Sequence, residues 1–360
     1  MKRFAKHYVL FHLLNDFSGS PKVLRDVAET LVKNGHRVTL VTSGKDGFLA
    51  GIGGVNYKYI NYSWSPLKLI TLLSFLVVQL RYFFYALFLK KERIIYINTL
   101  LPFGAALGGW IRGKRVVYHL HEPQVDPKPL FSVLKKVASL TSTDQIFVSN
   151  YLKDVLNIHN NKRASVVYNC VSEEYYQYVS QVKERQEAFT VLMACSLKSY
   201  KGIYQFLDIA RALPNIKFKL ILNSSSSMLR HFLEQNNISK NCEIMGTQSS
   251  MIPHYQQANL VLNLSIKDHW IESFGLTLIE AMCFGIPVIC PAVGGPLEVV
   301  ENDQSGYHLD SLFPKEIECK IKELADDANL YNRLSKRAKI RAKQYSKATF
   351  SDKIYNFLEC

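Results

Sequence analysis

Short apolar runs alternate with amphipathic segments along the 360-residue chain. After the first run, Val23, Leu24, Val27, Leu31 and Val32 recur at the spacing of one helix face, and Asn34-Gly35 ends that helix. The first half therefore predicts repeated strand–loop–helix–strand units. Apolar runs typical of buried strands occupy residues 8–14, 37–42, 94–97, 115–119, 144–148 and 164–168.

A polar, charged stretch at residues 173–188 separates this first set of elements from a second one. The second set predicts strands at 190–195, 218–222, 242–245, 260–264 and 288–290, with helices at 203–213, up to 235 and at 275–284. Two successive alternations of strands and helices indicate an α/β protein with two doubly wound domains. We expect domains at 1–172 and 189–345 joined by the linker 173–188, with the ligand in the cleft between their carboxyl-edge loops.

Residues 67–89 are the most hydrophobic stretch and are interrupted by Lys68, Gln79 and Arg81. The longest uncharged piece is about half of the ~20 residues that a membrane span needs, and a central arginine costs about 2.5–3.5 kcal/mol. A transmembrane helix is therefore not expected. Two interpretations remain open: a helix buried in the first domain, or a helix that lies on a membrane surface. Both are true if one face of the helix is buried and the other contacts the membrane. The basic residues that follow favour an anionic lipid surface: Lys90, Lys91, Arg93, Arg112, Lys114 and Arg115.

Positive charge is concentrated in the first half of the chain. Residues 1–172 carry 23 Lys+Arg against 9 Asp+Glu, whereas residues 173–360 carry 21 of each. This asymmetry indicates an anionic partner for the first half, for which nucleic acid and an anionic membrane surface are the usual candidates. A dispersed basic surface that aids solubility is the less favoured alternative. Seven cysteines lie singly without a CxxC pair, and no export signal is apparent, so we expect reduced thiols and a cytoplasmic protein.

Candidate chemistry is concentrated in residues 272–298. Glu272 and Glu280 lie eight positions apart, so a helix at 275–284 carries Glu280 and leaves Glu272 in the preceding loop. A helix N-terminus that follows a glycine binds anions, because free N–H groups and the helix dipole point at the ligand. Together with the turn at Gly294-Gly295-Pro296, the segment predicts a phosphate-and-sugar site.

Further candidate residues follow predicted strands or begin predicted helices. Gly19 lies in the loop after the first strand, where open α/β sheets bind ligands, but a single glycine there is more often a turn residue than part of a phosphate-binding loop. His119 and His121 sit at a strand end, where an imidazole contacts a sugar hydroxyl, acts as an acid or base, or is structural. A metal is the weaker interpretation, because further ligands with zinc-like spacing are absent from the sequence. Lys201 beside Gly202 suits a phosphate, although an isolated lysine is usually just exposed.

In combination, these segments resemble the retaining GT-B glycosyltransferases of family 4, the group 1 nucleotide-sugar transferases. The matching stretches are SLKSYKG at 196–202, ESFGLTLIE at 272–280, AMCFGIPVICPAVGGPLEVV at 281–300 and SGYHL at 305–309. Each stretch alone is a weak signal, whereas their order and spacing together are specific. The resemblance covers nearly the whole chain and implies two Rossmann-like domains that face a central cleft. It also suggests that residues 346–360 form a helix that packs back on the first domain.

The resemblance implies a catalytic role for three residues. Glu272 would lie beside the donor sugar, and Lys201 would neutralise the leaving diphosphate. His121 matches the sugar-contacting histidine of the family, with His119 as the second candidate. Positive charge and fixed N–H donors are what the departure of a diphosphate requires.

Donor binding is implied for a wider set of residues. Glu280 would bind the ribose, and backbone amides at 274–276 would meet the diphosphate and sugar. Ser196 stands where the family usually has a basic residue. Either Lys198 substitutes for that residue, or the site handles the diphosphate with less charge. The full set is Gly19, Ser196, Lys201, Phe274, Gly275, Leu276 and Glu280.

The function implied by the resemblance is transfer of a sugar from a nucleoside-diphosphate sugar to an acceptor with retention of configuration, without a metal or other cofactor. The basic first half points to a lipid-linked glycan acceptor at the cytoplasmic membrane face, as in a bacterial surface polysaccharide pathway. A GT-B phosphorylase or sugar epimerase is the alternative enzyme. A basic nucleic-acid-binding protein is the alternative from another class, but the sequence contains none of the usual nucleic-acid-binding motifs.

Overall fold

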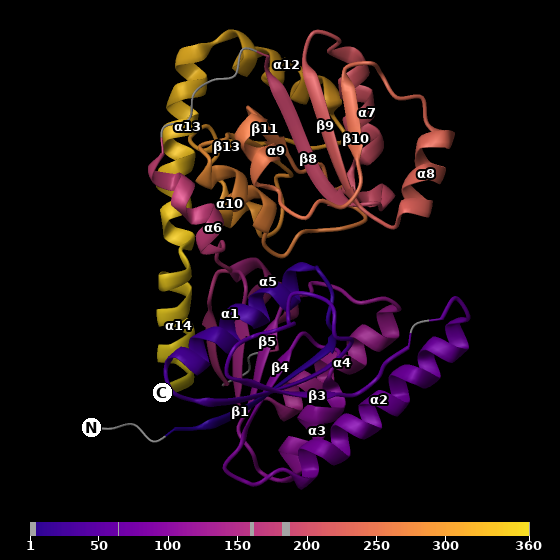
Figure 1. The fold of residues 1–360 in the computed structure, drawn as a ribbon, viewed down its shortest axis with the longest axis vertical. Coiled ribbons are helices and arrows are strands. Elements are labelled where there is room, and N and C mark those ends of the chain that lie inside the picture. Colours follow the sequence, from indigo (N-terminus) through magenta and orange to yellow (C-terminus); the bar gives the residue numbers. More distant parts are fainter. Residues whose placement is uncertain (1–4, 64, 159–161, 182–187, 360) are drawn as a thin grey trace. The chain divides into compact units, whose positions relative to one another are not determined.

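The computed structural model of the chain describes residues 5–63, 65–158, 162–181 and 188–359. The chain divides into two compact units: unit 1 comprises Met1–Asn169 and Ala348–Cys360, and unit 2 comprises Cys170–Lys347. Each unit is built around its own parallel sheet with helices between the strands (Figure 1). This architecture confirms the α/β, doubly wound class predicted from the alternating pattern.

The seven strands of unit 1 lie in the order β3-β2-β1-β4-β5-β6-β7, and the described pairs are parallel. All residues of β4, β5 and β6 are buried, and β4 and β5 accordingly are largely apolar in the sequence. The strand order changes direction between β1 and β4, and open α/β sheets bind ligands at such a point. The strands are β1 (His7–Leu14), β2 (Arg37–Ser43), β3 (Val55–Tyr59), β4 (Ile94–Asn98), β5 (Val116–Leu120), β6 (Asp144–Phe147) and β7 (Arg163–Val166).

The last helix of the chain packs on unit 1, where Phe350, Ile354 and Leu358 bury its apolar face. Arg115 donates to the carbonyl of Leu358 at 2.6 Å and to the Asp144 carboxylate at 2.9 Å, so this arginine is used inside the unit and does not face lipid. The helices of unit 1 are α1 (Gly19–Lys33), α2 (Lys68–Phe88), α3 (Phe103–Ile111), α4 (Lys128–Thr141), α5 (Asn150–Leu156) and α14 (Lys347–Glu359).

Helix α2 runs along the outside of unit 1 (Figure 1). Its inner face is anchored by polar bonds: Gln79 Oε1 accepts from the Gly104 amide at 3.0 Å, and the Tyr82 hydroxyl donates to the His12 carbonyl at 3.1 Å. By length and composition alone α2 would suffice to cross a membrane, and only 28% of its most apolar window is buried in the protein. The helix therefore has one face in the core and one exposed face. This arrangement is one of the possibilities that the sequence analysis left open.

Lys114, which the sequence suggested as a lipid-facing residue, is buried instead. Its ammonium group donates to the carbonyls of Leu89 and Lys90 at the end of α2, at 2.9 and 2.7 Å. Burial lowers the pKa of this lysine. Lys114 and Arg115 are thus structural, which leaves Lys90, Lys91, Arg93 and Arg112 as surface charges.

Unit 2 is built on a six-stranded sheet in the order β10-β9-β8-β11-β12-β13. The order changes direction between β8 and β11, which are directly paired in parallel. The strands are β8 (Thr190–Ser196), β9 (Lys217–Asn223), β10 (Cys242–Met245), β11 (Leu260–Leu262), β12 (Val288–Cys290) and β13 (Gly306–His308). The helices are α6 (Glu173–Tyr176), η1 (Gln177–Ser180), η2 (Ser199–Lys201), α7 (Ile203–Ala212), α8 (Ser226–Gln235), α9 (Ile252–Gln257), α10 (Leu276–Cys283), α11 (Pro296–Val299), α12 (Pro314–Asp326), α13 (Ala328–Ala342) and η3 (Lys343–Tyr345).

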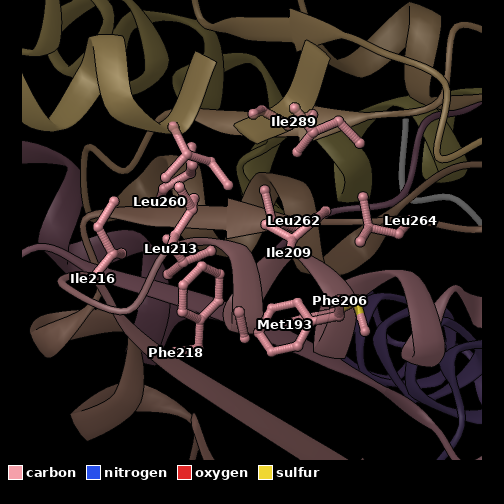
Figure 2. Packing of buried hydrophobic residues seen from close by; sticks show 14 of the residues in the cluster. Met193, Phe206, Ile209, Leu213, Ile216, Phe218, Leu260, Leu262, Leu264 and Ile289 are labelled. Atoms are coloured by element: carbon pink, nitrogen blue, oxygen red, sulfur yellow. The ribbon is translucent and has the colours of Figure 1, made fainter. Parts of the chain in front are cut away.

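The core of unit 2 joins the sheet to α7, as Figure 2 shows. Met193 of β8 and Leu262 of β11 are almost wholly buried in it. Phe206 of α7 and Phe218 of β9 meet edge to face, with ring centroids 5.4 Å apart. Because this packing fixes β8, β11 and α7 against one another, it also fixes the loops that leave their ends.

The predicted linker belongs to unit 2 as far as the structure describes it. Residues 173–180 form α6 and η1, and Tyr175 and Val179 are buried. Tyr178 stacks on Phe284 with ring centroids 4.4 Å apart. The polar composition of the segment concealed these apolar anchors, and residues 182–187 of the predicted linker lie outside the described residues.

Candidate functional site

The switch point of the unit 2 sheet brings together Lys201, Glu272 and Ser265. Lys201 ends η2 just after β8, and Ser265 follows β11. The Lys201 ammonium is paired with Glu272 Oε1, and the Ser265 hydroxyl donates to the same oxygen at 3.2 Å. The side chains of Lys201 and Glu272 are 15% and 21% exposed, so the pair is accessible from solvent and only partly screened by it.

Gly202 allows the loop of Lys201 to approach the loop of Ser265. Its φ of 78° is left-handed, and a Cβ at this position would lie 2.1 Å from the carbonyl oxygen of Leu264. The Ile266 amide donates to the Tyr200 carbonyl at 2.9 Å, which joins the two loops on the other side of Lys201. The glycine of SLKSYKG therefore has a packing role that places the lysine beside Glu272.

A second close approach holds the loop of Glu272. The Gly295 amide donates to the Glu272 carbonyl at 2.9 Å. A Cβ on Gly295 would lie 2.1 Å from the Ser273 carbonyl oxygen, which leaves no room for any larger residue. The glycine turn predicted from the sequence is thus a support for the backbone that presents Glu272.

Aromatic rings form one wall around Lys201. Tyr200 and Trp270 stack with centroids 5.5 Å apart, and the Lys201 ammonium lies 5.2 Å from the centroid of Trp270. Burial raises the pKa of the nearby Cys195 thiol to about 12, while Lys201 lowers this pKa and Glu272 raises it by smaller amounts. Cys195 is therefore a neutral thiol at physiological pH and has no nucleophilic role here.

Glu280 lies on α10 and is buried, with 7% of its surface exposed. The Tyr255 hydroxyl of α9 donates to Glu280 Oε2 at 3.0 Å. Burial, followed by the Glu280 charge, raises the pKa of Tyr255 well above its usual value, so this tyrosine remains a donor. Tyr255 fixes the orientation of the carboxylate to which the sequence had assigned the ribose.

The N-terminus of α10 carries the predicted backbone donors. Gly275 caps the helix with a left-handed φ of 109°, and Leu276 is the first helical residue, so the helix begins one residue later than predicted. Phe274 is buried, and its ring meets Tyr345 edge to face at 5.8 Å. This packing orients the backbone at 274–276, where the first helical N–H groups have no intrahelical acceptor.

Ser196 occupies the position where the family resemblance leads one to expect a basic residue. It is the last residue of β8 and is half-buried. Lys198 caps η2 and is exposed, and its amide donates to the Ser196 carbonyl at 2.7 Å. Both residues lie within a few positions of Lys201 in the sequence. A contact of either side chain with a phosphate stays a prediction.

In unit 1, Asn98 connects several candidate residues at the switch between β1 and β4. Its Oδ1 accepts from His121 Nε2 at 2.9 Å, while its Nδ2 contacts His12 Nδ1 at 3.1 Å and donates to the Ser20 carbonyl at 3.1 Å. Gly19 is the exposed first residue of α1, next to Ser20. Asn98 thereby positions both His121 and the start of α1.

The structure distinguishes the two histidines after β5. His119 is fully buried and bonds to the Tyr96 hydroxyl at 2.8 Å, and burial lowers its pKa to about 3. His121 reaches the surface, and its pKa is lowered well below the usual range, first by desolvation and then by His119 and His12. A neutral His121 that donates from Nε2 to an amide oxygen has Nδ1 as its acceptor.

Next to this group, Glu122 is a feature that the sequence did not single out. Burial raises the pKa of its carboxyl to about 7, partly opposed by backbone N–H groups that include that of Leu100. Its Oε2 is buried without a hydrogen-bond partner in the described part of the chain. Among the described residues, no cluster of three or more His, Cys, Asp or Glu side chains suits a metal ion.

The candidate residues therefore form one group in each unit. Unit 2 assembles Lys201, Glu272 and Glu280 around α10, and unit 1 assembles Gly19 and His121 around Asn98. Sequence reasoning missed Asn98, Ser265 and Tyr255. A signal existed for the first two, because Asn98 ends β4 and Ser265 follows β11, each at the switch point of its sheet.

Comparison with known families decides what these groups belong to. The family model described as "Glycosyl transferases group 1" matches residues 177–341, and that described as "Glycosyltransferase Family 4" matches residues 17–175. Together they account for both units. The chain belongs to the family 4, group 1 glycosyltransferases. The family resemblance inferred from the sequence is thereby confirmed.

Curated relatives are distant and match over different lengths. The uncharacterized glycosyltransferase MJ1607 of Methanocaldococcus jannaschii is 24% identical over 342 residues, which cover 84% of each chain. A sucrose synthase of Melioribacter roseus is 40% identical over 97 residues, which are 24% of this chain and 12% of that enzyme. The matched stretch thus covers about an eighth of the sucrose synthase and most of MJ1607.

Solved structures share the fold of this glycosyltransferase family member. Anabaena HepE, solved in complex with UDP-glucose, is 20% identical and superposes with a TM-score of 0.77 over 98% of this chain and 99% of that one. Sucrose-phosphate synthase of Thermosynechococcus elongatus is 17% identical, with a TM-score of 0.78 over 98% of each chain. The predicted two-domain, Rossmann-like GT-B fold is confirmed.

Proposed function

We propose that this glycosyltransferase moves a sugar from a nucleoside-diphosphate sugar to an acceptor hydroxyl, with retention of the anomeric configuration. The observation that carries the proposal is the pairing of Lys201 with Glu272 beside the N-terminus of α10, with Glu280 buried on the same helix. One cation, a set of backbone donors and two carboxylates match the parts of such a donor: diphosphate, sugar hydroxyls and ribose.

Lys201 and the start of α10 bind and stabilise the diphosphate as it leaves. Negative charge grows on the phosphate oxygens when the bond to the sugar breaks, and a fixed ammonium with oriented N–H groups is most effective against such growing charge. Glu272 orients the sugar hydroxyls near the reacting carbon. Glu280, held by Tyr255, accepts hydrogen bonds from the ribose hydroxyls.

The roles of Gly19 and His121 in unit 1 stay predictions. His121 is neutral at physiological pH, since desolvation lowers its pKa, so it accepts a hydrogen bond from a hydroxyl rather than donating a charge-assisted one. The amide of Gly19, at the start of the 15-residue helix α1, is a donor suited to a phosphate oxygen. No metal or other cofactor is required in this scheme.

The acceptor is a lipid-linked glycan at the cytoplasmic face of the membrane, of the kind used for bacterial surface polysaccharides. The concentration of positive charge in residues 1–172, 23 basic against 9 acidic, supports an anionic membrane as the partner of unit 1. The protein is accordingly peripheral on the cytoplasmic membrane, and its donor and acceptor are its main partners.

A screen of nucleotide-sugars tests the proposed function directly. UDP-, GDP- and ADP-sugars are incubated with the protein, and release of nucleoside diphosphate is measured with and without glycolipid acceptors. We expect slow hydrolysis of one donor class, a raised Tm with the matching nucleoside diphosphate, and retention at the anomeric carbon by NMR. Absence of both hydrolysis and thermal stabilisation for every nucleotide would overturn the proposal.

The same assays separate the alternatives. A GT-B phosphorylase forms a sugar phosphate from a glycan and inorganic phosphate, and an epimerase changes the sugar without an acceptor. A nucleic-acid-binding protein gives binding to polynucleotide that falls steeply with salt, and no nucleotide-dependent rise in Tm.

A further inference from the structure

The outward face of α2 is apolar and exposed. Leu69, Leu73, Leu76, Leu80, Phe84 and Phe88, here called the α2 stripe, are between 47% and 80% exposed. They follow one another at intervals of three or four residues, which places them on one side of a helix. By contrast, α1 in the same unit exposes no large apolar side chain along its fully described length. Exposed apolar patches of this extent mark interaction surfaces.

A groove of about 930 Å³ lies between the end of β3 and the C-terminal half of α2. Leu80, Phe84 and Phe88 of the α2 stripe form its apolar wall. The rings of Phe84 and Phe88 are nearly parallel, with centroids 6.4 Å apart. The groove thus continues the apolar surface of the stripe inward.

Four basic side chains line the same groove: Lys58, Arg81, Lys90 and Arg93. None of the four forms an ion pair in the described parts of the chain. Residues 58–93 contain six Lys and Arg but a single acidic residue, Glu92, so little local charge compensates them. Paired cations would suggest a structural network, whereas uncompensated cations beside an apolar wall indicate an anionic and partly apolar ligand.

We infer that this groove binds the phosphate of an anionic membrane lipid while the α2 stripe lies in the boundary between head groups and acyl chains. The inference rests on the proposed function, because it places the partner membrane on one site of unit 1. An amphipathic helix about 30 Å long that lies in the membrane plane buries its apolar side chains, and flanking arginine and lysine residues meet the lipid phosphates. The basic side chains of the groove and the apolar side chains of the α2 stripe would then bind the same ligand, an anionic lipid in a membrane.

A second copy of the chain fits this surface less well. In a symmetric dimer the same patch is used by both protomers, so each basic groove would face another cluster of the same sign at short range. A lipid surface of opposite charge has no such repulsion. This complementarity is the reason for choosing the membrane as occupant.

The inference is tested by cosedimentation of the full chain with vesicles of phosphatidylcholine that contain phosphatidylglycerol, and with vesicles of phosphatidylcholine alone. We expect binding to the anionic vesicles and at least about tenfold weaker binding for Arg81→Gln/Lys90→Gln. Leu76→Gln/Leu80→Gln in the α2 stripe should have a similar effect at constant charge. All four side chains are exposed, so the variants keep the wild-type Tm.

Matched controls separate the groove from general charge and apolarity. Lys91→Gln/Arg112→Gln removes two exposed charges from unit 1 outside the groove, and Ile340→Gln removes an apolar side chain that is 47% exposed on α13. Both controls should retain most of the binding. A loss for Lys91→Gln/Arg112→Gln equal to that for the groove variant would show diffuse charge attraction and overturn the site.

Two other outcomes overturn the inference as well. Unchanged vesicle binding by both test variants is one, and a wild-type dimer that Leu76→Gln/Leu80→Gln converts to monomer without altering vesicle binding is the other. Binding is measured without donor, and thermal stabilisation by the nucleoside diphosphate is measured in parallel without vesicles. Failure of vesicle binding alone therefore rejects the groove, whereas failure of nucleotide stabilisation alone rejects the proposed function.

Discussion

Lys201 and Glu272 are 71 positions apart in the chain and are paired at the switch point of one sheet. The pair sets two opposite charges where a donor with a diphosphate and a sugar is proposed to bind. In the proposed binding mode, the diphosphate competes with Glu272 for the Lys201 ammonium. We therefore expect binding and catalysis to depend on the two residues in different ways.

Substitution of each partner should separate these dependences. We expect Lys201→Gln to weaken nucleoside diphosphate binding by at least about tenfold, because a charge-assisted contact is worth about 1.5–3 kcal/mol. Glu272→Gln should bind the nucleotide at least as tightly as the wild type, since it removes a competing carboxylate, and yet lose transfer. Calorimetric titration and initial rates measure both effects.

Glu316→Gln, which removes an exposed carboxylate on α12, is the matched control and should change neither quantity. Equal weakening of nucleotide binding by Lys201→Gln and Glu272→Gln would contradict the division of roles.

Tyr255→Phe tests the orientation of Glu280. Loss of the hydroxyl that donates to Glu280 at 3.0 Å should weaken nucleotide binding by about tenfold and leave the fold intact, because phenylalanine fills the same space. Tyr82→Phe, which loses a bond to the His12 carbonyl in unit 1, controls for the removal of a buried hydroxyl. It should lower Tm without changing nucleotide affinity, and a similar affinity loss in both variants would argue against the assignment of Glu280.

Gly295→Ala tests the support of the Glu272 loop. The added Cβ would sit 2.1 Å from the Ser273 carbonyl oxygen, so the backbone must move, at a cost of about 1–3 kcal/mol in stability. We expect kcat/KM for transfer to fall by at least about tenfold. Gly53→Ala, where a Cβ meets nothing within 4 Å, should leave both Tm and activity unchanged. Full activity of Gly295→Ala would refute the proposed support.

The pH dependence of stability should reflect buried groups of unit 1. Burial lowers the pKa of His12 to about 4 and that of His119 to about 3, so the unfolded chain gains protons near pH 6.5 that the folded chain does not take up. Stability from these histidines is present above pH 6.5 and declines as the pH falls towards 4. Glu122 acts in the opposite direction, because its folded pKa of about 7 lies above the unfolded value and protonation favours the folded state between pH 7 and 4.5.

Glu122→Gln removes the compensating effect and leaves that of the histidines. Its Tm should therefore fall more steeply than that of the wild type between pH 7 and 5, by the equivalent of roughly 1–3 kcal/mol. Thermal unfolding in buffers of matched ionic strength measures the slopes. Parallel curves for wild type and variant would show that the Glu122 carboxyl is not protonated in the folded chain.

The sequence was sufficient for the fold class, and it singled out the candidate residues of unit 2 that stand in spaced motifs, whose roles stay predictions. Lys201, Glu272 and Glu280 come from such motifs, and the buried parallel strands appear as plain apolar runs. The edge strand β3 was missed, because it is mostly exposed and has no continuous apolar run. The helices α6 and η1 were taken for a linker, since Tyr175 and Val179 are isolated apolar residues among charged neighbours.

Residues that act through contacts distant in sequence left little signal. Tyr255 meets Glu280 across 25 positions, and Asn98 meets His121 across 23. Nothing in the local pattern around Tyr255 distinguishes it from an ordinary buried aromatic residue. Asn98 could have been found from its place at the end of a strand beside the switch point, but only once the strand order was known.

The attachment of α14 to unit 1 has a consequence for how the protein is made. A ribosome that adds about 5–20 residues per second needs roughly 10–35 s to synthesise the 178 residues of unit 2, Cys170–Lys347, after unit 1 has emerged. Throughout that interval Arg115 lacks its acceptor at Leu358, and the surface that receives Phe350 and Ile354 is uncovered. Unit 2 can therefore mature during synthesis, whereas unit 1 completes its packing only after α14 has been synthesised.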